Sequence, residues 1–238
     1  WGSLSAQSAG SNYSRQVNTL IGTKGVGLTS GYLYPGATYP YGMVQFTPSY
    51  FSKRSGFVIN QLSGGGCEHM GNFPTFPVKG KLKMSPDNIL NYRINISEEK
   101  GHAGYYEAMV QEDIKAKLTV TERTGMASYE YPTDQQYGTV IIGGGISATP
   151  IEQAAIVITA PNKCEGYAEG GNFCGLRTPY KVYFVAEFDT DALESGTWKR
   201  NELKPNTTFA EGEYSGVYFT FDVNKKKNIQ YKIGVSYV

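Results

Sequence analysis

Hydrophobic and polar residues alternate with a period of two along much of this chain, and long stretches with helical periodicity are scarce. Alternation places successive side chains on opposite faces of a strand, so each such run predicts a strand with one buried face. The predicted strands are Met43–Thr47, Val78–Met84, Tyr92–Ile96, Gly104–Val110, Ala116–Glu122, Ala127–Tyr131, Gly138–Ile142, Ala154–Thr159, Lys181–Phe188, Gly216–Asp222 and Ile229–Val238. Turn-forming residues separate them, which favours packed antiparallel sheets over βαβ units.

The beginning of the chain departs from this pattern. Residues 1–11 are mainly serine, alanine and glycine, which predicts a flexible tail before a single β-sandwich domain at residues 12–238. Val17, Leu20 and Ile21 have helical spacing, but the segment is too short for more than one turn. Lys225–Lys227 are expected at a hairpin tip. Because the first residue is Trp1 and not methionine, we expect an upstream piece to have been removed.

Charge and hydropathy exclude two classes of partner. The 22 Lys and Arg residues balance 21 Asp and Glu residues, so the formal net charge is +1. This balance provides no field that would attract nucleic acid or an anionic membrane. No run approaches the roughly 18 apolar residues that a membrane-spanning helix needs. The sequence thus predicts neither a nucleic-acid partner nor a membrane span.

The three cysteines leave the redox compartment open. Cys164 and Cys174 flank a small polar segment, and a disulfide between them or two free thiols agree equally well with the sequence. The disulfide would stabilise the fold by roughly 2 to 3 kcal/mol. Cys67 is expected to be a buried small side chain. Cys67, His69 and His102 lack the spacing of a zinc site.

The stretch Gly56–Pro77 cannot be ordinary core strand, because it contains three consecutive glycines, Gly64, Gly65 and Gly66. Such a run suits a sharp turn or the close approach of a ligand to the backbone. Amide, hydroxyl and aromatic side chains that commonly bind sugars surround it. A structural turn without a ligand is the main alternative, and the following glycine and prolines exclude the helix that a phosphate-binding loop needs.

Glu187 and Asp189 form a candidate catalytic pair. They lie two residues apart on one predicted strand face, with their backbones about 6.5 to 7 Å apart, near the low end of the carboxyl separation used by inverting glycosidases. A solvated strand face with Lys181 nearby is the favoured alternative, because a general acid needs partial desolvation to raise its pKa.

Several segments together resemble the N-terminal domain of glycoside hydrolase family 92, whose members are exo-acting α-mannosidases. The matching segments are Asn18–Thr23, Tyr34–Pro48, Gly56–Pro74, Gly104–Tyr106, Thr121–Gly125, Phe173–Gly175 and Tyr180–Phe188, in the expected order. The resemblance implies a large antiparallel β-sandwich of the supersandwich type, similar to galactose mutarotase. It also implies an (α/α)6 catalytic barrel after residue 238.

The same resemblance implies a function. Family members hydrolyse mannosides with inversion, using a carboxylic acid, a carboxylate base and a calcium ion that lie mainly in the barrel. This chain would then contribute one wall of the mannose pocket and no catalytic residue, and would be inactive alone. Its partners would be its own C-terminal domain and α-mannosides, such as those of N-glycans, in a secreted or periplasmic protein that could also be anchored at the cell surface.

The residues that match the pocket wall are Phe57, Asn60, Gln61, Ser63, Gly64, Gly65, Gly66, Cys67 and Asn72. Many relatives carry Ser-His-x-His where this chain has Val58-Ile59-Asn60-Gln61, and Asp in place of Asn72. These departures leave α-1,2, α-1,3 and α-1,4 linkages open. A stand-alone carbohydrate-binding module and a β-domain without a ligand are the alternative functions.

Overall fold

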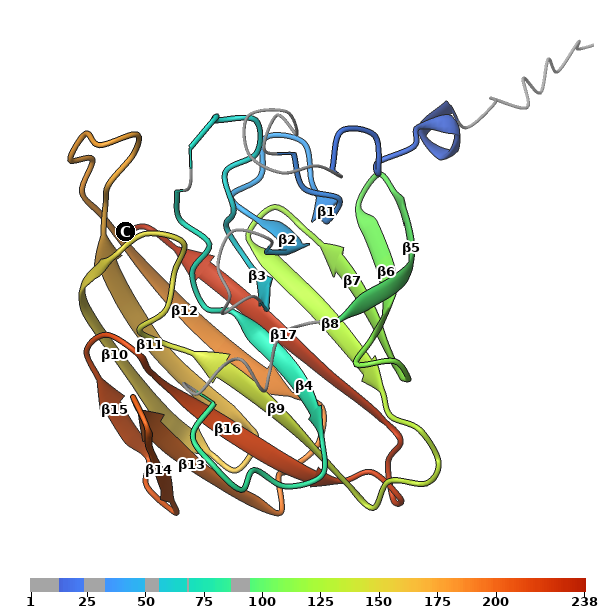
Figure 1. Ribbon diagram of the computed structural model, residues 1–238, viewed down its shortest axis with the longest axis vertical. Helices are drawn as coiled ribbons and strands as arrows, with labels where there is room; N and C mark the ends of the chain where they lie inside the picture. Colours follow the sequence, from blue (N-terminus) through green and yellow to red (C-terminus); the bar gives the residue numbers. More distant parts are fainter. Residues whose placement is uncertain (1–12, 24–32, 50–55, 68, 87–94) are drawn as a thin grey trace, which may run out of the picture.

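The computed structural model describes residues 13–23, 33–49, 56–67, 69–86 and 95–238, and the predicted tail at residues 1–11 lies outside them. The strands form two antiparallel sheets packed face to face (Figure 1). One sheet has the order β1 (Ala37–Thr38), β2 (Gln45–Pro48), β3 (Phe57–Val58), β4 (Thr75–Lys79), β9 (Tyr137–Gly143), β16 (Ser215–Asp222), β13 (Glu194–Lys199) and β14 (Glu202–Pro205).

The second sheet has nine strands. Its order is β15 (Phe209–Glu211), β10 (Ile151–Ala160), β11 (Lys163–Gly170), β12 (Tyr180–Phe188), β17 (Asn228–Ser236), β8 (Thr124–Glu130), β7 (Ile114–Val120), β6 (Tyr105–Val110) and β5 (Ile96–His102). The helical element of the described residues is a 3-10 turn, η1 (Tyr13–Gln16). The prediction of an all-β antiparallel sandwich is therefore confirmed.

Strand β12 shows how the period-two pattern builds the core. Phe184 and Phe188 point inward and are buried, whereas Tyr183, Val185 and Glu187 lie on the outer face. The Phe188 ring lies 4.9 Å from that of Phe219 on β16, in the opposite sheet. Apolar side chains from the two inner faces thus fill the space between the sheets, where burial supplies most of the stabilisation.

A tyrosine pair inside the sandwich satisfies its own polar atoms. The hydroxyl groups of Tyr129 and Tyr231 lie 3.1 and 2.5 Å from the Thr75 hydroxyl. Burial raises the pKa of both phenols, because the phenolate would be desolvated. These groups are therefore neutral and link β4 to the nine-stranded sheet through hydrogen bonds.

One sequence-based strand boundary needs correction. The predicted strand Val78–Met84 ends at Lys79, because Gly80 adopts a φ of 76° and its carbonyl accepts a hydrogen bond from Thr139 Oγ1 at 2.7 Å. Val17 and Ile21 are exposed, so their helical spacing does not mark a buried helix face. The predicted strand Tyr92–Ile96 lies largely outside the described residues, and β5 begins at its last residue.

The predicted turn at Lys225–Lys227 is confirmed between β16 and β17. Several short or polar strands were not predicted, namely β1, β3, β5, β11, β13, β14 and β15. In the described part of the chain, no helix is long and apolar enough to cross a membrane.

Candidate functional site

The glycine-rich loop connects β3 to β4 at one end of the sandwich. We define it as residues 59–72, of which the structure describes all but residue 68. The turn between β11 and β12, the segment before β2 and the end of the chain lie at the same end (Figure 1). The loop is buried at its two ends and is exposed at residues 62–64 and at Gly66. It is therefore a surface feature with buried supports.

Two glycines of the run occupy conformations that other residues rarely adopt. Gly64 has a φ of 74° and Gly66 a φ of 73°. A Cβ on Gly66 would meet nothing within 4 Å, so that position faces open space. A Cβ on Gly65 would lie 3.3 Å from both Leu62 and Phe173, which leaves little room for a side chain. The run thus presents bare backbone to solvent.

Buried amides support the loop from below. Asn60 Nδ2 donates to Asn72 Oδ1 at 2.9 Å and to the Tyr237 hydroxyl at 3.1 Å, and Asn60 Oδ1 accepts from the Asn72 amide at 2.7 Å. The Tyr180 hydroxyl donates to Asn72 Oδ1 at 3.0 Å. Burial raises the pKa of Tyr180 and Tyr237. The two neutral phenols and two amides fix the loop against β12 and the end of the chain.

Gln61 provides a second internal support. Its Nε2 donates to the His69 carbonyl at 2.9 Å, across the open part of the loop. Gly71, at a φ of 71°, lets the Gln61 carboxamide approach, since a Cβ there would lie 2.7 Å from Gln61 Oε1. Both ends of the loop are thereby held together by one side chain.

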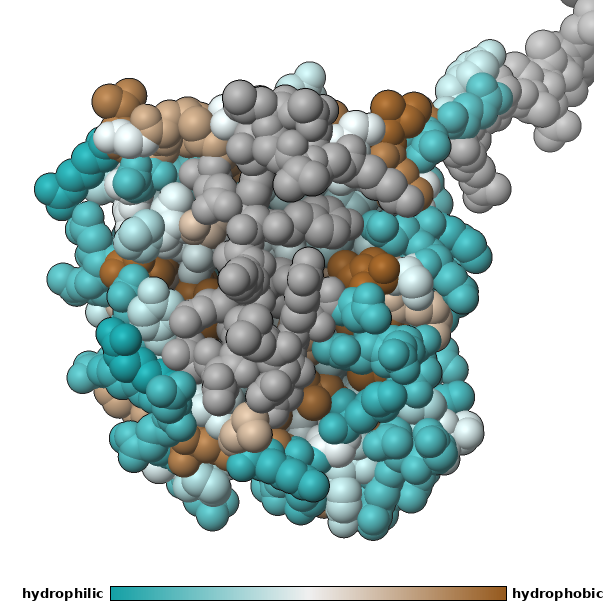
Figure 2. Space-filling view, in the orientation of Figure 1, coloured by the Kyte–Doolittle hydropathy of each residue, from teal (hydrophilic) through white to brown (hydrophobic). Residues whose placement is uncertain are grey.

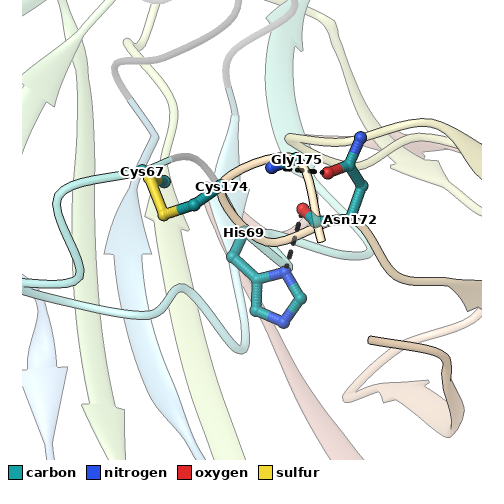
Figure 3. Close-up of a disulfide and its surroundings, with 5 residues drawn as sticks. All are labelled: Cys67, His69, Asn172, Cys174 and Gly175. Atoms are coloured by element: carbon teal, nitrogen blue, oxygen red, sulfur yellow. Dashed lines mark hydrogen bonds between the residues drawn. A yellow bond between two sulfur atoms is a disulfide. The ribbon is translucent and has the colours of Figure 1, made fainter. Parts of the chain in front are cut away.

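A disulfide joins Cys67 to Cys174, which lies in the turn between β11 and β12 (Figure 3). Beside it, His69 Nδ1 lies 3.4 Å from the Asn172 carbonyl oxygen, and the Gly175 amide donates to Asn172 Oδ1 at 3.0 Å. The bond spans 107 residues of sequence and anchors the glycine-rich loop to the nine-stranded sheet.

The predicted alternatives for the cysteines are corrected by this bond. Cys164 lies in β11 with its side chain in the core, where burial raises the pKa of its thiol. Cys164 lies at the start of β11, whereas Cys174 lies in the turn after the end of that strand. The extended strand therefore keeps the two sulfur atoms apart. Cys67 is a disulfide partner and not the small buried thiol that was expected.

Apart from Phe57 in β3, the predicted site residues lie in the glycine-rich loop, and besides the disulfide-bonded Cys67 they form a buried and an exposed group. Phe57, Asn60, Gln61 and Asn72 are buried, and the Phe57 ring stacks on Tyr129 within the core at 6.0 Å between ring centroids. Ser63 and the three glycines reach the surface, and Ser63 Oγ accepts from the Tyr34 amide at 3.3 Å. Their contact with a substrate stays a prediction, and burial favours an indirect role for the first group.

Sequence reasoning missed several supports of this loop, namely Tyr180, Tyr237, Asn172 and Cys174. Of these four, Cys174 could have been found from the sequence. It lies in the segment Gly-Asn-Phe-Cys-Gly, which is small and polar like the glycine-rich loop. The two tyrosines gave no such signal, since alternating aromatics are typical of core strands.

Several exposed apolar side chains lie in the loop or in the chain segments at the same end of the sandwich. They are Leu33, Tyr39, Tyr41, Met43, Leu62 and Leu176, and Tyr41 is fully exposed. Figure 2 shows apolar residues, in brown, at both corners of this end of the molecule. Large exposed apolar areas commonly mark surfaces that contact another protein segment.

Glu187 and Asp189 lie elsewhere, on the outer face of the nine-stranded sheet. Glu187 is exposed and its carboxylate lies 4.0 Å from Lys163 Nζ, while Asp189 pairs with Lys226 at 2.9 Å. Asp189 also accepts from the Gln230 amide at 3.2 Å. Solvated ion pairs of this kind agree with the favoured alternative, a polar strand face.

An antiparallel sandwich of an eight-stranded and a nine-stranded sheet belongs to the class of large β-sandwich domains. The sequence model of the "Glycosyl hydrolase family 92 N-terminal domain" matches residues 16–236. Because the match spans nearly the whole chain, this chain belongs to glycosyl hydrolase family 92 as its N-terminal domain.

Similar solved structures agree in fold. The family 92 α-mannosidase BT3965 from Bacteroides thetaiotaomicron superposes with a TM-score of 0.80 at 23% identity, over 96% of this chain and 34% of that chain. The family 92 inverting mannosidase BT2199 from the same organism gives a TM-score of 0.73 at 21% identity, over 95% of this chain and 32% of that one. This chain thus spans about a third of their length.

A curated relative is an uncharacterized secreted glycosidase of Arthroderma benhamiae. It is 31% identical over 138 residues, which are 50% of this chain and 17% of that protein. This chain therefore corresponds to a small part of that relative as well.

Proposed function

We propose that this domain forms one wall of the mannose pocket of an exo-α-mannosidase, against an (α/α)6 catalytic domain that follows it. Family membership supports the proposal, as do the printed descriptions of the structural relatives as mannosidases, one of them inverting. BT3965 has also been solved in complex with mannoimidazole. The substrates would be terminal α-mannosides of glycans, and hydrolysis would proceed with inversion.

The observation that carries the proposal is the construction of the loop end. The exposed glycine run lies at the same end of the sandwich as several exposed apolar side chains, and Tyr237 contacts Asn60 of the loop. A polypeptide that continues from Val238 would therefore begin beside the loop. A catalytic domain docked there would bury these side chains and enclose the glycine run in a cleft between domains, where ligand sites are common.

The residues would divide their roles according to burial. Ser63 and the glycines would contact the sugar, since bare backbone lets a pyranose ring approach and its N–H and C=O groups can bind hydroxyls. Asn60, Gln61, Asn72, Phe57 and Cys67 would hold the loop in position. The general acid and base would come from the catalytic domain, in agreement with the exposed ion pairs of Glu187 and Asp189.

Calcium in the complete enzyme is part of the proposal, with its ligands mainly in the catalytic domain. Within the described ranges, no group of three or more His, Cys, Asp and Glu side chains is placed to hold a metal ion. We place the protein outside the cytoplasm, in a secreted or periplasmic location, which the Cys67–Cys174 disulfide and the name of the secreted relative support.

The deciding experiment measures mannose release from α-1,2-, α-1,3- and α-1,4-mannobiose, with calcium and with a chelator. It compares this chain with the same chain extended through its downstream domain. Activity confined to the extended, calcium-loaded form is expected. Activity in the isolated chain would contradict the proposal, and mannoside binding by an inactive extended form would instead favour a carbohydrate-binding module.

A loop variant tests the pocket wall directly in the extended enzyme. Gly66→Asn keeps a residue that tolerates positive φ and adds a side chain where the glycine faces open space. We expect KM to rise at least about tenfold with unchanged stability, equivalent to about 1.4 kcal/mol of lost binding. Gly80→Asn is the matched control, with a φ of 76° and equally open surroundings at the far end of β4. Equal kinetics of the two variants would count against a role for the loop.

A further inference from the structure

The outer face of the nine-stranded sheet is hollowed along a line that crosses its strands. Two adjoining hollows of about 520 and 450 Å3 share Val185 as a lining residue. We call the combined depression the outer trough, and its lining includes Tyr167, Tyr183, Val185, Glu187, Gln230 and Lys232. It lies on a different surface from the glycine-rich loop.

Strand register arranges these side chains in three parallel rows. In the middle row, cross-strand pairing places Phe209 beside Val157, Glu165 beside Val185, and Val185 beside Gly234. Gly234 deepens this row, since a Cβ there would meet only Thr124 Oγ1 at 3.7 Å. The floor of the trough therefore combines Val157, Val185, Gly234 and Phe209 with one exposed carboxylate, Glu165.

An aromatic row borders the floor on one side. Tyr167 and Tyr183 are direct cross-strand partners with ring centroids 6.1 Å apart, and 41% of Tyr183 is exposed. Lys181 Nζ lies 4.2 Å from the Tyr167 ring centroid and forms an ion pair with Glu169 at 2.7 Å. Cross-strand packing and the cation hold both rings in place, so a ligand would meet them preorganised.

Polar groups border the other side. Lys163, Glu187 and Lys232 follow one another across β11, β12 and β17, and Gln230 lies next to them on β17. The charges are of both signs and Lys163 already faces Glu187 at 4.0 Å, so the border attracts neither a polyanion nor a polycation. It offers donors and acceptors for an uncharged polar ligand.

We infer that the outer trough binds a neutral oligosaccharide, separately from the mannose pocket. The apolar faces of pyranose rings would pack on Tyr183, Tyr167 and Val185, while their hydroxyl groups would bind Glu187, Gln230 and Lys232. The volume of the two hollows lies within the range of ligand sites, roughly 300 to 1,000 Å3. A second copy of this chain fits less well, because two identical concave faces do not fill each other.

The test uses this chain and measures its Kd for soluble yeast mannan and for mannotriose by calorimetry, with laminarin and xylan as other neutral glycans. We expect one of these glycans to bind, and Tyr183→Ala and Val185→Arg each to weaken binding at least about tenfold. Val185→Arg fills the floor from a position that is 42% exposed, so it is informative even if the tyrosine variant folds poorly. Tyr105→Ala, on the outer face of β6 away from the trough, is the matched control and should bind normally.

Three results would overturn the inference. The first is that no neutral glycan binds to the folded chain. The second is that Gly66→Asn abolishes binding while Val185→Arg does not, which would assign the ligand to the glycine-rich loop. The third is that sedimentation finds a dimer which Val185→Arg converts to a monomer, which would make the trough a self-contact. None of these results depends on mannose release by the extended enzyme, so the two proposals can fail separately.

Discussion

The interior between the sheets and the glycine-rich end are stabilised by different interactions. In the interior, aromatic rings from opposite sheets pack directly, as Phe188 does on Phe219 and Phe221. At the glycine-rich end, a covalent bond and side-chain amides hold a loop that offers few apolar contacts of its own. The interior therefore stabilises the fold through the apolar surface that it buries. The loop end depends instead on a few specific bonds between side chains.

The largest effect is expected from Phe188→Ala in the interior. It removes a ring packed between the sheets, and the cavity should lower the free energy of unfolding by about 4 kcal/mol. Chemical denaturation measures this change. Val185→Ala, on the outer face of the same strand, is the control and should change stability by less than about 1 kcal/mol. Similar losses in both variants would mean that the inner and outer faces do not differ as described.

Removal of the disulfide should come next. Cys67→Ser opens a loop of 107 residues, and we expect a loss of about 3 kcal/mol together with faster proteolysis within residues 59–72. In the unmutated chain, unfolded without reductant, mass spectrometry should find one alkylated thiol, at Cys164, and three after reduction. Alkylation at Cys67 in the unreduced protein would contradict the assigned pairing.

Asn60→Ala tests the amide support with a smaller expected effect. The variant removes the partner of the buried Asn72 backbone amide and one of the two partners of the Asn72 side chain, which keeps Tyr180. We expect the free energy of unfolding to fall by about 2 kcal/mol. In the extended enzyme, KM should rise more than kcat falls. The variant would displace the substrate-binding loop but leave the catalytic carboxylates of the downstream domain in place. Asn162→Ala, whose amide donates to the Phe188 carbonyl far from the loop, should leave KM unchanged.

The smallest effect should come from the charges on the outer face of β6. The hydrogen bond from Tyr105 at 2.6 Å, followed by Lys115 and Lys100, lowers the pKa of Glu107. A lowered carboxyl pKa contributes stability above the usual glutamate range, which is lost as the pH falls through the lowered value. Glu107→Gln should thus lower the free energy of unfolding by less than about 1 kcal/mol at pH 7. In acid it should leave the free energy of unfolding unchanged. Thermal unfolding at several pH values measures it, and a constant difference would contradict the linkage.

Sequence patterns predicted the interior better than the loop end, and the reason is physical. Strand β12 was predicted nearly to its bounds, because a sheet with one buried face imposes a period of two on its residues. The Cys67–Cys174 bond could not be predicted, since it joins residues that only the assembled sheets bring together. The pocket residues came from family resemblance, and that resemblance could not reveal that Asn60, Gln61 and Asn72 are buried.

The position of β17 has a consequence for biosynthesis. This last strand of the domain lies in the middle of the nine-stranded sheet, between β12 and β8. Until the ribosome has released it, the nascent chain has two half-sheets with open edges, which are prone to pair with other chains. Folding must therefore wait for the whole domain to be translated. We expect ribosome-bound chains that lack β17 to depend strongly on chaperones.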